Sequence, residues 1–179
     1  AKEYGWTVYQ CERGKLTARD FGIRKARGEI IVSVDADTYY LREWLGRILR
    51  YFNQGNVVGV TSPRFLNPKE VGFFLTFMSV GFSLIDVGPL GLGGFRITGQ
   101  GSAFLREAYF EVGGFNLNIN QQNVHEMVRE EEIRFAWKLR RLGKVLVAWD
   151  TPVFTSARRA PILGIDHKYA KERMRGQRF

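Results

Sequence analysis

The chain has 179 residues, of which 45% are hydrophobic and 25% charged, a composition that is ordinary for one globular domain with a sizeable core. Its 27 Lys and Arg outnumber its 18 Asp and Glu, and the net charge of +9 indicates an anionic partner: a phosphorylated substrate, a nucleic acid or an acidic membrane surface. Cys11 is the only cysteine, which excludes an internal disulfide, and no signal peptide is visible. Because the chain starts at Ala1 rather than at Met, we expect an N-terminal piece to be missing.

The first predicted elements are a strand and a helix. Residues 6–11 have the composition of a strand, and residues 15–27 follow a helical pattern that stops at Gly28. The positions of this helix that we expect to be buried are Leu16, Ala18, Ile23 and Ala26.

A short apolar strand followed by two carboxylates is the most informative stretch. Four of the six residues 29–34 are Ile or Val, which is typical of a strand in a parallel sheet covered by helices on both faces. Ligands bind beyond the carboxyl ends of such strands, where Asp35 and Asp37 follow. A divalent cation such as Mg²⁺ removes the repulsion between two carboxylates and takes its other ligands from phosphate and water. Alternatively, Asp35 caps a turn and Asp37 is the N-cap of the next helix.

The next elements continue the alternation of strands and helices. Apolar residues at helical spacing predict a helix over residues 41–52, which Gly55 closes, and residues 57–61 form another apolar strand. This order predicts an α/β fold with a parallel sheet.

The segment from Val71 to Leu92 is almost wholly apolar, with Asp86 as its only charged residue. Its glycines, its proline and this charge argue against a membrane-spanning helix. Two interpretations stay open. The segment is a helix that lies against a lipid surface or a partner, or it is a plain core helix.

The glycine-rich residues 91–101 contain no GxGxxG that follows a strand and opens a helix, which argues against a dinucleotide-binding fold. We expect a close approach of the backbone to a ligand there. Residues 102–105 then resemble a strand, residues 106–112 a short helix, and residues 116–123 a polar loop.

The clearest helix covers residues 127–142. Val128, Phe135 and Leu139 form an apolar stripe on which Glu132 also falls. A carboxylate on an apolar face is costly to bury unless something uses it, and the alternatives are an ion pair with an arginine or a solvated first turn. Residues 144–149 predict a last strand, and a basic tail follows.

In this order, the segments resemble the inverting family 2 glycosyltransferases, which have the GT-A fold. One departure is that nothing in this chain matches the family's first strand or the acids that end its second strand. The segments that carry the resemblance are Ala18-Arg19-Asp20-Phe21-Gly22-Ile23 (with Asp20 where Asn is usual), Val34-Asp35-Ala36-Asp37, residues 98–104 with Val112-Gly113-Gly114-Phe115, and the helix that opens with Glu131-Glu132.

The resemblance implies an α/β fold of the GT-A (Rossmann-like) type, with a mixed, mostly parallel sheet flanked by helices. It implies one catalytic domain over residues 1–179, in which residues 1–64 form the donor and metal half and residues 95–159 the acceptor and base half. Residues 160–179 remain as the basic tail.

The resemblance also implies roles for individual residues in an inverting transfer of a sugar from a nucleotide-diphosphate donor to a hydroxyl acceptor. Glu132 inherits the place of the family's general base, one methylene longer than the usual Asp. The other expected roles are metal ligands (Asp37 and Asp35, with Mn²⁺ or Mg²⁺), donor or diphosphate contacts (Asp35, Arg19, Arg158 and Arg159) and acceptor contacts (Gly99, Gln100, Gly101 and Glu131).

The expected partners are a nucleotide-sugar donor and a saccharide, lipid-linked or protein acceptor, with a peripheral membrane contact through the segment from Val71 to Leu92. We expect no nucleic-acid partner, because no recognised binding motif accompanies the positive charge. The expected location is the cytoplasm, at the inner face of the membrane. The alternative function is a catalytically inactive scaffold of the same fold that binds a nucleotide or a membrane.

Overall fold

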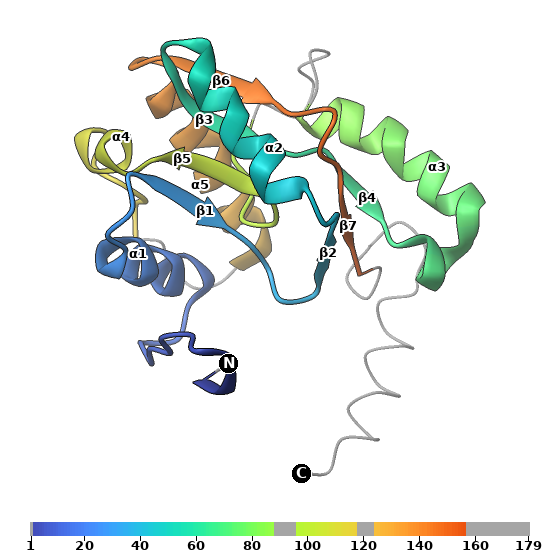
Figure 1. Cartoon of the computed structure of the whole chain (residues 1–179), viewed down its shortest axis with the longest axis horizontal. Coiled ribbons are helices and arrows are strands. Elements are labelled where there is room, and N and C mark those ends of the chain that lie inside the picture. The colour runs from blue at the N-terminus through green and yellow to red at the C-terminus, as the bar shows by residue number, and fades with distance from the viewer. Residues whose placement is uncertain (1, 88–95, 118–123, 157–179) are drawn as a thin grey trace.

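The computed structural model describes residues 2–87, 96–117 and 124–156, which form a mixed α/β structure (Figure 1). Its helices are η1 (Lys2–Tyr4), α1 (Lys15–Lys25), α2 (Trp44–Arg50), η2 (Tyr51–Gln54), α3 (Pro68–Val87), α4 (Arg106–Glu111) and α5 (Val124–Leu139). Its strands are β1 (Ile30–Ser33), β2 (Thr38–Tyr40), β3 (Val57–Thr61), β4 (Arg64–Leu66), β5 (Ser102–Leu105), β6 (Lys144–Val147) and β7 (Val153–Thr155).

The larger sheet has the strand order β1-β5-β3-β6. β3 and β6 are parallel, and β5 pairs antiparallel with both β1 and β3, so that β1, β3 and β6 all run in one direction. The predicted mixed α/β sheet is therefore confirmed. The antiparallel strand, β5, lies between β1 and β3. The alternation of strands and helices had not predicted an antiparallel strand at this place.

A smaller sheet of three short strands has the order β2-β7-β4. β7 pairs antiparallel with β2 and parallel with β4. None of these three-residue strands was predicted, because an alternating pattern cannot be recognised over so few residues. The smaller sheet matters for the site, since β2 begins one residue after Asp37.

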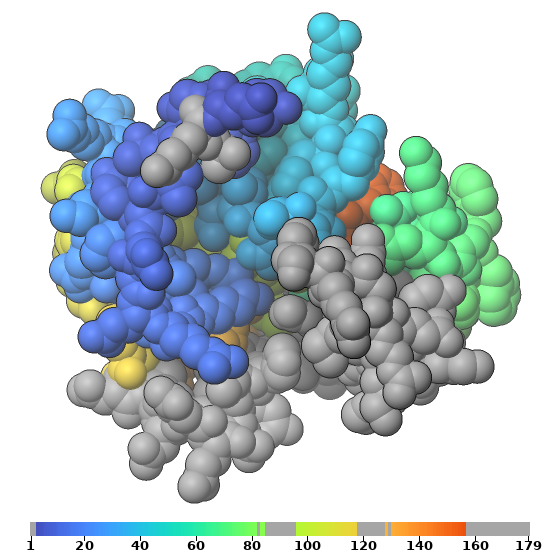
Figure 2. All heavy atoms as spheres, turned by 90° about the horizontal axis from the view of Figure 1, so that it is seen from below, coloured from blue at the N-terminus to red at the C-terminus, as the bar shows by residue number. Residues whose placement is uncertain are grey.

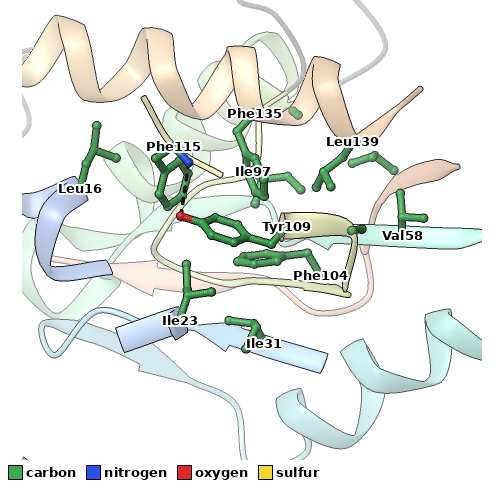
Figure 3. Close-up of a cluster of buried hydrophobic side chains, with 13 residues drawn as sticks. Leu16, Ile23, Ile31, Val58, Ile97, Phe104, Tyr109, Phe115, Phe135 and Leu139 are labelled. Atoms are coloured by element: carbon green, nitrogen blue, oxygen red, sulfur yellow. Dashed lines mark hydrogen bonds between the residues drawn. The ribbon is translucent and has the colours of Figure 1, made fainter. Parts of the chain in front are cut away.

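Two apolar clusters hold the larger sheet between helices. The cluster in Figure 3 joins the sheet to α1, α4 and α5, and its centre is the fully buried Tyr109. The Tyr109 ring stacks on Phe104 with a centroid distance of 5.8 Å and meets Phe135 edge-on at 5.4 Å. The second cluster joins the other face to α2 through Trp44, Ile48, Val57, Val60, Ala103, Ala148 and Val153.

A buried hydrogen-bond network runs through the first cluster. The Tyr109 hydroxyl donates to Asp20 Oδ1 at 2.7 Å and accepts the Phe115 N–H at 3.3 Å. Burial, and next the bond to Asp20, raise the pKa of Tyr109, so its hydroxyl stays protonated and continues to donate at neutral pH. Asp20 thereby ties α1 to α4.

Two of the predicted features near the N-terminus are wrong. Residues 6–11 form no strand, and Trp6 and Tyr9 are exposed, because no strand in the described part of the chain pairs with this stretch. In α1, Leu16 and Ile23 are buried as expected, but Ala18 is exposed and Asp20 takes a buried place instead.

The predicted helix over residues 41–52 is shorter, since α2 begins at Trp44 and continues into η2.

α3 is a helix whose polar side faces the protein. In Figures 1 and 2 it lies at one end of the molecule, and in Figure 1 it runs beside β4. The Ser83 and Ser79 hydroxyls accept the backbone N–H groups of Arg64 and Leu66 at 3.0 Å each, and the Thr76 hydroxyl donates to the Leu66 carbonyl at 3.1 Å. These side chains replace the hydrogen bonds that a further strand would make with β4.

The outer side of α3 is apolar. Phe73, Phe74 and Phe77 are 87%, 74% and 73% exposed, and Met78 is 48% exposed. For residues 71–87, a plain core helix is therefore the wrong interpretation, and residues 88–92 of the segment lie outside the described residues. No helix among the described residues is long and apolar enough to cross a membrane.

Candidate active site

Four segments that are distant in the sequence meet at the carboxyl end of β1. They are the turn after β1 with Asp35 and Asp37, α1 with Lys15 and Arg19, residues 96–101 before β5, and α5 with Glu132. This is the edge at which ligands bind to open α/β sheets.

Arg19 joins the two carboxylates that the sequence singles out. Its Nη1 donates to Glu132 Oε1 at 2.8 Å, and its Nη2 donates to Asp35 Oδ1 at 3.3 Å. Lys15 Nζ lies 3.8 Å from the other oxygen of Asp35. One guanidinium therefore connects α5 to the end of β1.

Glu132 is buried and surrounded by hydrogen-bond donors. Its side chain is 7% exposed, and Oε1 also accepts the Gly99 N–H at 3.2 Å. Arg96 Nη1 lies 3.6 Å from Oε2, and the Arg96 side chain is also 7% exposed. Of the alternatives for this residue, the ion pair with an arginine is found and the solvated first turn is wrong.

Gly99 leaves room for the Arg19 guanidinium. A Cβ on Gly99 would lie 1.5 Å from Arg19 Nη2 and 1.7 Å from Arg19 Cζ, whereas the φ of Gly99 is not positive and an L residue can adopt it. The sequence predicted a close approach of the backbone to a ligand in this stretch, but the group that lies against Gly99 is the Arg19 guanidinium.

We predict that Gly99→Ala displaces Arg19 from Glu132 and leaves a buried carboxylate with one fewer partner. The free energy of unfolding should fall by about 1–3 kcal/mol, as measured by urea denaturation. Gly22→Ala, in α1 with nothing within 4 Å of the added Cβ, is the matched control and should stabilise the protein by about 0.5–1 kcal/mol. Equal stabilities for Gly99→Ala and the parent would show that Arg19 leaves this position at no cost.

The acid pair lies in a turn held by Tyr40. The turn is closed by the Asp35 backbone carbonyl, which accepts the Thr38 N–H at 3.3 Å, and Glu43 rather than Asp37 is the N-cap of α2. The Tyr40 hydroxyl accepts the Asp35 N–H at 2.9 Å and donates to the Gln100 carbonyl at 3.0 Å. Burial raises the pKa of Tyr40, so the hydroxyl remains a donor. The turn is thereby fixed to residues 99–101.

Asp35 and Asp37 are the side chains of this turn that could hold a divalent cation together with phosphate and water. The described residues contain no group of three or more His, Cys, Asp or Glu side chains placed to hold a metal. Asp35 faces Arg19 and Lys15, while the Asp37 side chain is exposed beyond the end of β1. One or two carboxylates are what Mg²⁺ takes from proteins that bind it together with phosphates.

The other expected site residues are placed as follows. Gln100 Oε1 accepts from Arg64 Nη1 at 2.6 Å, and the Gly101 carbonyl accepts the Ser62 N–H at 2.8 Å, so both hold the backbone near Gly99. Glu131, an expected acceptor contact, is buried at 1% exposure. Its Oε1 accepts the Asn116 N–H at 2.8 Å, and its Oε2 is buried without a hydrogen-bond partner.

Some expected site residues could not be compared with the structure, and some residues that lie at the candidate site were not expected. Arg158, Arg159, the basic tail and most of the polar loop at 116–123 lie outside the described residues. Lys15, Tyr40 and Arg96 were not predicted. Arg96 did have a signal, since it is the only charged residue between Asp86 and Arg106.

Residues 1–113 match the sequence model of glycosyl transferase family 2. The chain belongs to this family. No curated protein sequence gives a significant match to the chain. The match to the family model confirms the resemblance that the motifs of this family 2 chain indicate.

Two solved structures show the same fold. The first is the mannosyltransferase PcManGT from Pyrobaculum calidifontis in complex with GDP-Man and Mn²⁺, with a TM-score of 0.58 and 20% identity over 84% of this chain. The second is GalNAc-T7 with UDP, GalNAc and Mn²⁺, with a TM-score of 0.54 and 17% identity over 83% of this chain. This chain spans 38% and 32% of their lengths. The fold is that of GT-A glycosyltransferases, as expected.

Proposed function

We propose that this family 2 chain transfers a sugar from a nucleotide-diphosphate donor to a hydroxyl acceptor, with inversion at the anomeric carbon. The observation that carries the proposal is the contact of Arg19 with both Asp35 and Glu132. This contact supports the proposal because the two acidic residues that the proposed roles need, one in the turn after β1 and one buried in α5, share one guanidinium. The two solved structures described above were determined with a nucleotide or nucleotide sugar and Mn²⁺.

On the donor side, Asp37 with Asp35 would hold Mn²⁺ or Mg²⁺. When bound, the metal supplies several kcal/mol of stabilisation for the charge that develops on the departing diphosphate. Arg19 contacts Asp35 already and is placed to bind a phosphate oxygen with a charge-assisted hydrogen bond. Arg158 and Arg159 are proposed as further diphosphate contacts, since they follow β7 within a few residues.

On the acceptor side, Glu132 would remove the proton of the acceptor hydroxyl as the oxygen attacks the anomeric carbon. A positioned general base contributes about 10²–10⁴-fold to the rate. Gly99 orients Glu132 through its N–H, while Gln100, Gly101 and Glu131 shape the surrounding wall.

The alternative is an inactive scaffold of the same fold that binds the nucleotide but transfers nothing. Titration with UDP-, GDP- and dTDP-sugars, with and without Mn²⁺, separates the two when binding and release of the nucleoside diphosphate are both recorded. The proposed function requires Mn²⁺-dependent binding and turnover with at least one donor. Binding without turnover would indicate the scaffold.

We also propose that the outer side of α3 lies on an anionic membrane surface. α3 buries its hydroxyls against β4 and exposes Phe73, Phe74 and Phe77, an arrangement that favours an apolar environment outside the helix. The net charge of +9 favours an anionic bilayer over a neutral one.

The prediction is that the protein binds vesicles that contain anionic lipid and that added salt weakens this binding. Replacing Phe73 and Phe77 by Ser should lower the affinity by about tenfold per side chain, as judged by co-sedimentation, because each buried Phe contributes about 1.5–3 kcal/mol. The control is Leu45→Ser, which removes an exposed apolar side chain from a different helix, α2, and should leave the affinity for vesicles unchanged. Equal recovery in the soluble fraction with and without vesicles at low salt would refute the membrane contact.

A further inference from the structure

The geometry of Glu132 raises a question for its role as a base. Oε1, the oxygen that contacts Arg19 at 2.8 Å, also accepts the Gly99 N–H, and Arg96 lies beside Oε2. A general base must offer a lone pair to the hydroxyl from which it removes a proton. In this arrangement, Glu132 Oε1 already accepts hydrogen bonds from the Arg19 guanidinium and from the Gly99 N–H.

Arg19 is the partner of Glu132 that a ligand can reach. Its side chain is 13% exposed, compared with 7% for Arg96. Arg19 also lines a groove of about 240 Å³ between α1 and β1, whose other lining residues include Gly22, Ile31 and Ser33. A diphosphate that approaches the turn after β1 therefore meets two cations, Arg19 and the 42% exposed Lys15, and of these two Arg19 is the one bound to Glu132.

The second terminal nitrogen of Arg19 is bound to Asp35, one of the two residues proposed to hold the metal. Asp35 Oδ1 accepts from Arg19 Nη2 at 3.3 Å. A cation bound at the acidic turn would weaken the attraction between Asp35 and Arg19, because it competes for the same negative charge. The phosphates would at the same time offer Arg19 stronger acceptors.

We propose that Arg19 is a positioning residue whose guanidinium binds Glu132 in the free protein. When a nucleoside diphosphate with its metal binds, the guanidinium leaves Glu132 and binds the phosphates. This inference rests on the proposed function. In the released state, Glu132 Oε1 keeps the Gly99 N–H and accepts the proton of the acceptor hydroxyl. The acceptor oxygen then forms a bond to the anomeric carbon while the bond from that carbon to the phosphate oxygen breaks, and the diphosphate leaves with the electron pair.

The exchange has a consequence that can be measured without a known acceptor. If the diphosphate competes with Glu132 for Arg19, then removing the charge of Glu132 makes Arg19 easier to recruit. In the free Glu132→Gln protein, Arg19 loses its charged partner, and its hydrogen bond to residue 132 is weaker. We therefore expect this variant to bind UDP or GDP with Mn²⁺ about tenfold more tightly than the parent. A purely structural role for the pair gives unchanged or weaker binding.

The experiment is isothermal titration of UDP and GDP, each with Mn²⁺, into the parent, Glu132→Gln, Arg19→Met and the double variant. The control for a general loss of negative charge is Glu130→Gln, because Glu130 is exposed and pairs with Arg134 on the outer side of α5. We expect tighter binding for Glu132→Gln alone, and no gain when the same change is made in Arg19→Met. Melting temperatures of all variants identify any that fail to fold.

Each other outcome has a definite meaning. An equal gain for Glu132→Gln with and without Arg19 would overturn the inference in favour of simple electrostatics. Unchanged or weaker binding by a folded Glu132→Gln would also overturn it, while the proposed function would stand. If Glu132→Gln does not fold, Arg19→Lys replaces it. Lysine cannot bridge Glu132 and Asp35 with two nitrogens, but it keeps a positive charge for the diphosphate. The inference then requires that Arg19→Lys lowers the affinity for UDP or GDP with Mn²⁺ by less than half as much as Arg19→Met does. The parent's failure to bind either nucleotide would instead count against the proposed function.

Discussion

Glu132→Gln is expected to lower kcat by about 10²–10⁴-fold, the contribution of a general base, without weakening donor binding. Glutamine keeps the size of the side chain and an acceptor for the Gly99 N–H, but it cannot take a proton from the acceptor. The measurement is kcat at saturating donor, with donor affinity determined separately by calorimetry. A fall in kcat with intact binding assigns the loss to the chemical step.

The two neighbouring glutamates are the matched controls. Glu130→Gln should leave kcat within about twofold of the parent, because Glu130 is exposed and its partner is Arg134. Glu131→Gln is the more demanding comparison, since Glu131 is buried and its Oε2 lacks a hydrogen-bond partner. If Glu131→Gln abolishes turnover and Glu132→Gln does not, the base is Glu131 and the register assigned to α5 is wrong by one residue.

Asp37→Ala is expected to lower transfer by at least about a hundredfold and to abolish Mn²⁺-dependent nucleotide binding, because the metal supplies several kcal/mol at the diphosphate. The fold should survive. The Asp37 side chain is exposed, and its backbone carbonyl still accepts the Ser156 N–H at 3.3 Å. Removal of one of two repelling carboxylates should leave the stability almost unchanged. The measurement is the rate as a function of Mn²⁺ concentration, together with urea denaturation.

Glu43→Ala is the control for this variant. Glu43 is an exposed carboxylate that pairs with Arg47 within one turn of α2, away from the acidic turn. Its removal should change neither the rate nor the dependence on Mn²⁺. Activity of the parent that persists in EDTA would contradict the metal hypothesis whatever the result for Asp37→Ala.

The elements that could be predicted were those with a regular apolar pattern. β3 and β5 have the predicted bounds, and α4 and α5 lie within three residues of theirs. In α5, the positions of Phe135, Leu139 and Glu132 on one buried side follow directly from helical spacing. Local periodicity is enough where one side of an element meets the core.

The errors occur where the partner of an element decides its structure. Residues 6–11 have strand composition, but a strand needs a neighbour for its backbone hydrogen bonds, and none is paired with them among the described residues. In α3, composition shows an apolar helix, but it does not reveal that Ser79 and Ser83 face β4 while Phe73 faces outward. That orientation depends on β4, a strand too short to predict.

The candidate site divides in the same way. Asp35, Asp37, Arg19 and Glu132 could be identified from motifs, and the structure brings Arg19, Asp35 and Glu132 together. Their distances could not be predicted, because the contacts join α1, β1 and α5, which are far apart in the sequence. The occupation of Glu132 by Arg19, which underlies the proposed exchange, is visible only in three dimensions.

The configuration of the product at the anomeric carbon tests the central claim most directly. A single displacement with one carboxylate as base must invert this carbon, whatever the sugar or acceptor. Inversion requires that the first product formed from an α-linked nucleotide sugar has the β configuration, as read by proton NMR before any mutarotation. A first product that retains the α configuration would contradict the assignment of Glu132 as the base of an inverting transfer.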